Sequence, residues 1–295
     1  MSVLDAGELA AVCAFAEARI EPTPGLIDAW RQVHYAAQVA SEVGKAWAAP
    51  QPDDSHSSFT WQDGRLVGAW VQAPRRFRAA LGAADLELSL VDEGGRALAR
   101  RGLDGTTLPE AMAWVRSAAE RASGEGPRQA ALPAPDLPPH PVAEGARFSA
   151  GGRAAEDVAR LLAGADAVLR ATARALGGGD VRCWPHHFDI ATLVALGERA
   201  GEPVKTLGVG LAVPDALEAS GYWYVSPWAR DATPGRSWPP LRHGRWIDRG
   251  GPLRMAALSL DSLAALPGGP ARPAALASFL ADAIGACIDA LRPNA

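Results

Sequence analysis

Residues 85–110 read DLELSLVDEGGRALARRGLDGTTLPE. Leucine alternates with polar residues over 85–91, which is the period of a β-strand that buries one face. The turn Glu93-Gly94-Gly95 predicts that the chain reverses into an antiparallel partner strand over 96–103. Thr107-Leu-Pro109-Glu110 is a capping box with proline in the first turn, so it predicts a helix to about residue 122. Antiparallel strands followed by a flanking helix indicate an α+β fold.

The rest of the chain extends this pattern into two similar halves. Each half has antiparallel strands flanked by an N-terminal and a C-terminal helix, and Gln62-Asp63-Gly64 predicts a second hairpin in the first half. The repeated order suggests an internal duplication, with helices packed on one face of what could be one continuous sheet. The predicted helices are 5–20, 26–47, 107–122, 154–176 and 273–291, and the predicted strands are 57–61, 65–72, 85–91, 96–103, 181–184, 188–196, 204–212, 221–226 and 252–259.

A proline-rich stretch between the halves predicts the domain organisation. Residues 123–150 contain six prolines and few apolar anchors, which is typical of an extended linker or of a loop that follows the surface. We therefore expect an N-terminal α+β half over 1–122, a linker over 123–150, and a C-terminal α+β half over 151–295.

Composition narrows the classes of function. The chain has 295 residues and a formal net charge of -4, so bulk charge gives no reason to expect nucleic-acid binding. Three scattered cysteines exclude a disulfide framework. The sequence has no basic, apolar leader and no apolar run approaching the length of a membrane span, so we expect a cytoplasmic protein without a membrane partner. Its hydrophobic helices could form a homo-oligomer, and no motif identifies a cofactor.

The segment 181–190, VRCWPHHFDI, is the first candidate site. In an extended chain His187 and Asp189 project to one side, with Cα atoms about 7 Å apart, while His186 faces the other side unless Pro185 bends the strand. Asp189 could then orient His187 for acid–base catalysis, or the two side chains could share a metal ion. A hydrogen-bonded pair with a purely structural role is the alternative.

Aromatic residues downstream form the second candidate site. Tyr222 and Tyr224 share one strand face in YWYVSPW, and Gly208 and Gly210 in an earlier strand would permit a close approach of a backbone or a ligand. Ten tryptophans favour cores and pocket walls. A packed sheet face is the alternative, and for His34, beside a buried helix stripe, the alternative is a satisfied core histidine. The candidate ligand-binding residues are Trp184, His186, Tyr222, Tyr224, Trp228, Trp246 and His34.

The sequence also resembles an uncharacterised bacterial family classed as a domain of unknown function. The resemblance rests on Trp-Pro-x-His-Phe-Asp at 184–189, on the Tyr-x-Tyr strand at 222–224, and on His34, Gln38 and the Gly44-Lys45 pair, and it covers about residues 26–291. It differs at 218–221, where Glu-Ala-Ser-Gly stands in place of the family's Pro-Glu-Pro. The resemblance implies a structural role for the Phe-Asp pair and no established activity.

Three hypotheses follow. In the first, the protein binds a small molecule in an aromatic-lined pocket, with His187 and Asp189 as the polar contact. In the second, the same cluster is the site of a metal-dependent or acid–base enzyme, with a tyrosine stabilising negative charge. In the third, exposed tryptophans dock a protein partner. The sequence favours the binding protein.

Overall fold

The computed structural model describes residues 24–130, 132, 137–199, 202–232 and 238–292. It has the predicted α+β class, with five helices and two antiparallel sheets in the described ranges. The helix predicted over 5–20 lies outside the described residues. The two sheets are separate, so the alternative of one continuous sheet is wrong. Both halves follow the order helix, strands, helix, while a duplication stays a prediction.

Contacts divide the chain into two compact units. The first, here called the N-terminal unit, is Thr23–Arg160 together with Arg182–Phe188, and the second, the C-terminal unit, comprises the described parts of Leu161–Val181 and Asp189–Ala295. A short segment that is distant in sequence thus belongs to the N-terminal unit. The sequence predicted a division at 123–150, which differs from the division by contacts. Residues 137–150 of that stretch pack on the N-terminal unit, where Tyr35 donates a hydrogen bond to the carbonyl oxygen of Pro138 at 2.8 Å.

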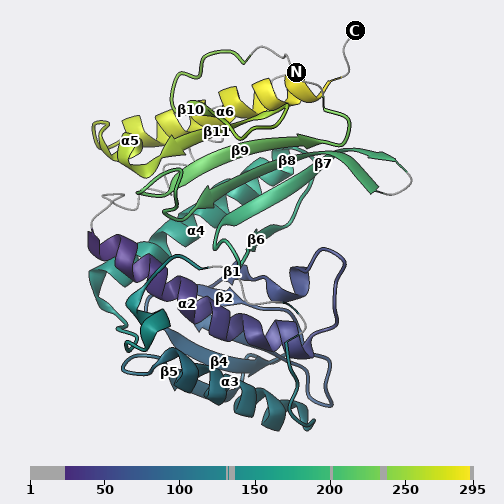
Figure 1. Cartoon of the computed structure of the whole chain (residues 1–295), viewed down its shortest axis with the longest axis vertical. Helices are drawn as coiled ribbons and strands as arrows, with labels where there is room; N and C mark the ends of the chain where they lie inside the picture. Colours follow the sequence, from purple (N-terminus) through teal and green to yellow (C-terminus); the bar gives the residue numbers. More distant parts are fainter. Residues whose placement is uncertain (1–23, 131, 133–136, 200–201, 233–237, 293–295) are drawn as a thin grey trace. The chain divides into compact units, whose positions relative to one another are not determined.

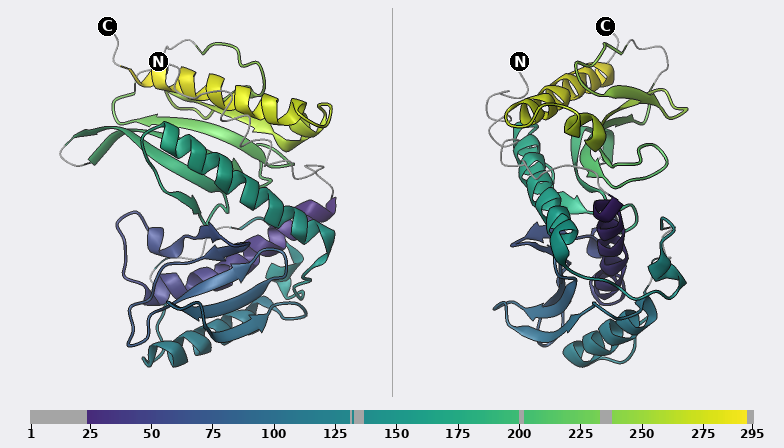
Figure 2. Two further views of the ribbon diagram at one scale, coloured as in Figure 1. Left: turned by 180° about the vertical axis from the view of Figure 1, so that it is seen from behind. Right: turned by 90° about the vertical axis from the view of Figure 1, so that its left-hand side faces the viewer.

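In the N-terminal unit, a five-stranded antiparallel sheet in the order β1-β2-β3-β4-β5 has two helices, α2 and α3, on one face (Figure 2). The hairpin at Asp63-Gly64 forms as predicted, since both residues have the positive φ that such a turn requires. The capping box also forms, with Thr107 and Glu110 bonded to each other's backbone N–H. The elements are α2 Pro24–Trp47, η1 Ser55–Ser57, β1 Thr60–Gln62, β2 Arg65–Val67, β3 Phe77–Gly82, β4 Glu87–Asp92, β5 Ala97–Gly102, α3 Leu108–Ser123 and η2 Pro141–Glu144.

Helix α2 is the central element of this unit and is buried on nearly every side between Trp30 and Gly44. The strand β3, which pairs with β2 and β4, was missing from the sequence prediction. The reason is its burial: every residue after Arg78 in this strand is buried, so the alternation of polar and apolar residues is absent.

The C-terminal unit contains most of the six-stranded antiparallel sheet, in the order β10-β11-β9-β8-β7-β6, while Arg182 and Cys183 of β6 belong to the N-terminal unit. Helix α6 packs along β9 (Figure 1) and its residues Phe279, Leu280 and Ile284 are fully buried. Strand β10 was not predicted because it is a half-exposed edge strand without an apolar pattern. The elements are α4 Gly152–Ala175, which begins in the N-terminal unit, β6 Val181–Cys183, β7 Ile190–Arg199, β8 Glu202–Ala212, β9 Tyr222–Ala229, β10 Arg245–Asp248, β11 Arg254–Ser259, α5 Leu260–Ala264 and α6 Ala271–Leu291.

Helix α6 corrects one sequence expectation. Among the described helices, it is long and apolar enough to cross a membrane by length and composition, whereas no such segment was expected. Half of its most apolar window is buried inside the protein. A core helix of a soluble protein passes the same test, so this feature is weak evidence for a membrane span. A cytoplasmic location stays a prediction of the sequence.

Candidate functional site

One face of α2 holds two segments of the N-terminal unit in place. His34 and Gln38, one turn apart, both donate a hydrogen bond to the carbonyl oxygen of Pro185, at 2.9 and 2.5 Å. Further along the same face, Ser41 donates to the carbonyl oxygen of Ser57 at 3.0 Å. The helix therefore fixes the Trp-Pro-His-His segment and the segment around η1 by contacts to their backbones.

Residues 185–187 form a turn and not an extended strand, so the geometry assumed for His187 and Asp189 is wrong. The backbone N–H of Phe188 donates to the carbonyl oxygen of Trp184 at 2.6 Å, which closes the turn. Pro185 bends the chain here. The sequence predicts that His186 and His187 face opposite sides only if no such bend occurs.

Phe188 holds this turn at a cost in backbone strain. Its φ is 55°, a left-handed conformation that a bulky side chain rarely adopts. The ring is fully buried and stacks on His34, with ring centroids 4.8 Å apart. Burial of a phenylalanine contributes about 2 kcal/mol, which offsets strain of about 1–2 kcal/mol. The turn exposes His186 and His187, whose ring centroids are 4.5 Å apart.

His34 is a satisfied core histidine. It is 2% exposed, and burial lowers its pKa to about 4, so the ring is neutral near pH 7. Because its Nε2 donates to a carbonyl oxygen, the proton lies on that nitrogen. The contacts thus favour the structural alternative for this candidate ligand residue.

Tyr224 and Asp189 form a second set of contacts, in the C-terminal unit. The Tyr224 hydroxyl donates to Oδ2 of Asp189 at 2.6 Å. Burial, and then the nearby Asp189 carboxylate, raise the pKa of Tyr224 well above its ordinary value. A Cβ atom added at Gly210 would lie 2.7 Å from the Tyr224 ring, so this glycine makes room for that ring. Asp189 thus contacts a tyrosine of its own unit.

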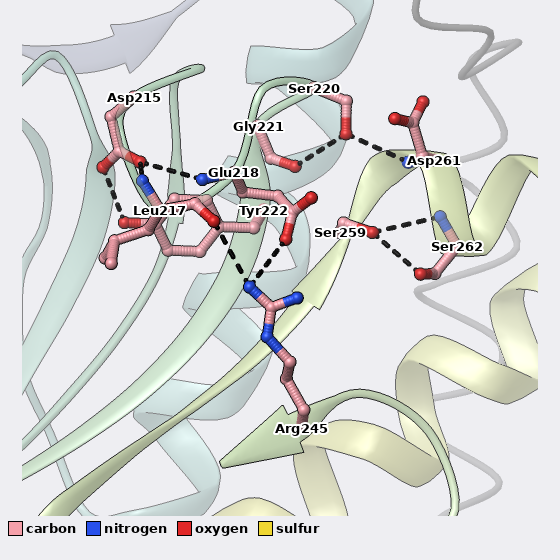
Figure 3. Close-up of polar contacts among 10 residues, drawn as sticks. All are labelled: Asp215, Leu217, Glu218, Ser220, Gly221, Tyr222, Arg245, Ser259, Asp261 and Ser262. Atoms are coloured by element: carbon pink, nitrogen blue, oxygen red, sulfur yellow. Dashed lines mark hydrogen bonds and ion pairs between the residues drawn. The ribbon is translucent and has the colours of Figure 1, made fainter. Parts of the chain in front are cut away.

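Tyr222 stabilises the turn before its own strand (Figure 3). Its hydroxyl donates to Oδ2 of Asp215 at 2.9 Å, and the other oxygen of Asp215 accepts the backbone N–H groups of Leu217 and Glu218. Arg245 on β10 donates to the carbonyl oxygen of Leu217 at 3.2 Å and pairs with Glu218 at 3.1 Å. Burial raises the pKa of Tyr222. Both tyrosine hydroxyls therefore make contacts typical of a packed sheet face.

The other aromatic candidates are distributed over both units. Trp246 donates a hydrogen bond to the carbonyl oxygen of Pro239 at 2.7 Å and packs on Trp238, while Trp228 in the same unit is 48% exposed. Trp184 belongs to the N-terminal unit, where its half-buried ring lies 6.0 Å from that of His186. The residues of the predicted aromatic pocket thus belong to two different units.

Within the described ranges, no three His, Cys, Asp or Glu side chains are grouped so that they could hold a metal ion. A tightly bound catalytic zinc ordinarily needs three protein ligands. A metal role for His187 and Asp189 therefore has no further support here and stays a prediction, as does their catalytic role.

A cavity of about 460 Å³ lies in the N-terminal unit, at a place that the sequence did not indicate. Its wall comes from Ala48 and Ala49 just after α2, from the segment around η1, from residues between the start of β1 and β3, and from Arg182 on β6. Gly44 shapes this region, because an added Cβ atom would lie 2.1 Å from the carbonyl oxygen of His56. The glycine thus lets η1, which carries part of the wall, pack directly on the helix.

Hydrogen-bond donors line this cavity. His56 accepts the backbone N–H of Gln51 at Nδ1, which leaves Nε2 as the protonated nitrogen when the ring is neutral. Arg78 donates to Oε1 of Gln62 at 3.1 Å, and Arg182 donates to the hydroxyl of Ser58 at 3.3 Å. Trp70 adds an aromatic wall, and the Arg78 guanidinium lies 4.4 Å from its ring centroid.

Sequence reasoning missed Arg78, Trp70 and His56, and it quoted Arg182 without singling it out. Arg78 lies on the strand that was not predicted, and Arg182 joins His56 in the cavity wall because 182–188 packs beside residues 55–60. A pair of backbone hydrogen bonds between Phe59 and Cys183 holds this contact. The signal in the sequence that could have pointed to this site was Arg182, which directly precedes the Cys-Trp-Pro motif.

No protein-family model matches the chain, and searches of curated proteins and of solved structures find no match either.

Proposed function

We propose that the protein binds a small molecule in the cavity of the N-terminal unit. The observation that carries the proposal is the cavity of about 460 Å³, which falls within the range of small-molecule sites. Most of its lining residues are polar and able to orient a ligand, and Val67 and Trp70 add apolar surface. This is the binding function that the sequence favoured, at a different place from the tyrosine strand.

The anchoring of the wall supports this proposal. Binding sites are effective when their side chains are held by a rigid framework. Here Ser41 and Gly44 of a buried helix hold η1, and the bridge between Phe59 and Cys183 holds β6. The strained residue Phe188 ends the segment that carries Arg182, and such strain is common near functional sites.

The test is a ligand screen with a blocked cavity. Ala69 is half-buried in the cavity wall, so Ala69→Phe should fill the space, whereas Ala97→Phe places the same ring at a half-buried position on β5, outside the lining. We expect metabolites that raise the melting temperature of the wild type and of Ala97→Phe to have no effect on Ala69→Phe. Ligands that stabilise all three proteins equally would contradict the proposal, as would a broad library without any binder.

A further inference from the structure

We propose that the cavity takes an organic anion, a small molecule whose carboxylate or phosphate group lies between Arg78 and Arg182. This inference rests on the proposed function and adds the chemical class of the ligand. It is argued from the charge of the wall, from the partners of each arginine and from the size of the cavity.

The cavity wall is positively charged in a protein that is acidic overall. Its lining includes two arginines and no aspartate or glutamate, although the chain has 33 acidic and 29 basic residues. His56 adds a donor at Nε2 whether its ring is neutral or protonated. A wall with two arginines and no carboxylate suits a ligand with an anionic group, such as a carboxylate or phosphate.

Arg78 lacks the carboxylate partner that its neighbours have. Arg75 and Arg76, just before it in the chain, pair with Asp92 and Glu93 at 2.7 and 2.5 Å. Among the described residues Arg78 pairs with no carboxylate, and its buried Nε, like that of Arg76, has no hydrogen-bond partner. A half-buried charge without a counter-ion costs free energy, which an anionic ligand would recover.

Arg182 faces the cavity from β6 and is the second positive group. It donates to Ser58, whose own hydroxyl donates to the carbonyl oxygen of Ser55 at 2.8 Å. The exposed carboxylate of Asp53 also interacts with Arg182, but it does not line the cavity. Arg182 is therefore partly compensated, and we assign the stronger effect on binding to Arg78.

The cavity is too large for an inorganic anion alone. A volume of about 460 Å³ is that of a site for a small organic molecule. The ring of Trp70, whose centroid lies 4.4 Å from the Arg78 guanidinium, gives the site an apolar wall. A ligand with an apolar or aromatic body and one anionic group would use both parts of the site.

The experiment compares ligands of one shape and different charge. Binding of benzoate, phenyl phosphate, benzyl alcohol and benzylamine is measured at millimolar concentration by protein-observed NMR. The proteins are the wild type, Arg78→Gln, Arg182→Gln, Ala69→Phe and the control Arg76→Gln, which removes a charge beside Trp70 but outside the cavity lining. The two anions distinguish a carboxylate site from a phosphate site.

We expect at least one anion to bind more tightly than the alcohol and the amine. Its affinity should fall at least tenfold in Arg78→Gln, by less in Arg182→Gln, and little in Arg76→Gln, and Ala69→Phe should abolish binding. Equal or tighter binding of the alcohol or the amine, blocked by Ala69→Phe, would overturn the anion inference and leave the binding function standing. Absence of any binding that Ala69→Phe blocks would overturn both.

Discussion

Gly44 and His34 illustrate how single residues of α2 act through the backbone of distant segments. Gly44 lies in a helix, where glycine costs about 1 kcal/mol relative to alanine. The structure accounts for it, since the carbonyl oxygen of His56 occupies the place of a side chain. The Nε2 of His34 donates a hydrogen bond to the carbonyl oxygen of Pro185, and its ring stacks on Phe188. Gly44 and His34 are among the residues on which the resemblance to the bacterial family rests, and both therefore have structural roles.

Gly44→Ala should lower the free energy of unfolding by about 3 kcal/mol, despite the gain in helix propensity, because η1 must move away from the helix. Gly285 in α6 is the matched control: an added Cβ atom meets nothing within 4 Å, so Gly285→Ala should stabilise by about 0.5–1 kcal/mol. Urea unfolding of both variants measures the difference. Equal stabilisation by both substitutions would contradict the close contact at Gly44.

His34 should make the protein less stable in acid. Its pKa is lowered to about 4 in the folded state from 6.5, so the unfolded chain binds the proton more readily. Its contribution is complete above pH 6.5 and is lost as the pH falls to about 4, where the loss approaches 3 kcal/mol. In His34→Gln, which retains a donor, the dependence of unfolding free energy on pH should flatten by this amount. A pH dependence in His34→Gln that equals that of the wild type would argue against this assignment.

At the scale of elements, β9 shows why a row of tyrosines predicts a binding site poorly. Tyr222 and Tyr224 do share one face, as the alternation predicts, and the buried part of that face includes Met255 and Ala257. Sequence period identifies the face, but only the neighbouring strands and loops determine whether the hydroxyls are free. In this structure Asp189 and Asp215 accept both of them.

Tyr224→Phe should cost more stability than Tyr222→Phe. Asp189, the partner of Tyr224, is half-buried, and burial raises the pKa of Tyr224, so loss of this hydroxyl should cost about 2 kcal/mol. Asp215, the partner of Tyr222, is exposed and remains solvated, so Tyr222→Phe should cost about 0.5–1 kcal/mol. A double-mutant cycle of Tyr224→Phe with Asp189→Asn should give a coupling energy above 1 kcal/mol in thermal or urea unfolding. Additive effects would mean that this hydrogen bond contributes little.

At the scale of the molecule, the N-terminal unit is completed by a segment from the other half of the sequence. Arg182–Phe188 supplies the carbonyl oxygen bound by His34 and Gln38, a buried phenylalanine, and one wall of the cavity. A cut in the proline-rich stretch, where the sequence predicts a domain boundary, would therefore separate the N-terminal unit from part of its own core.

A fragment of residues 1–160 should be markedly less stable than the same unit in the whole chain. Adding a synthetic peptide of residues 180–190 should raise its melting temperature, because the peptide restores the contacts of Pro185 and Phe188. The control peptide carries Phe188→Ala and should have a much weaker effect, since it loses the buried ring. Circular dichroism measures both. If the fragment alone melts like the full chain, the segment is dispensable for this unit.

The sequence by itself determined the elements whose signals are local. These are the helix 26–47, the capped helix after Thr107, the Asp63-Gly64 hairpin and the α+β class, because periodicity, capping and turn chemistry depend on residues a few positions apart. It also identified the Trp-Pro-His-His segment as informative, although the turn there was read as an extended strand. The sequence did not predict β3, because this strand is buried on both faces, or β10, because it is a polar edge strand.

Only the tertiary structure decided where the candidate site lies. His34 and Pro185 are 151 positions apart in the sequence, and the cavity joins Arg78 to Arg182 across two halves of the chain. No local sequence pattern encodes contacts between residues so far apart, because these contacts depend on which surfaces pack together once the elements have formed. The same packing determines which hydroxyls are bonded, and among the described residues it leaves Arg78 without a carboxylate partner.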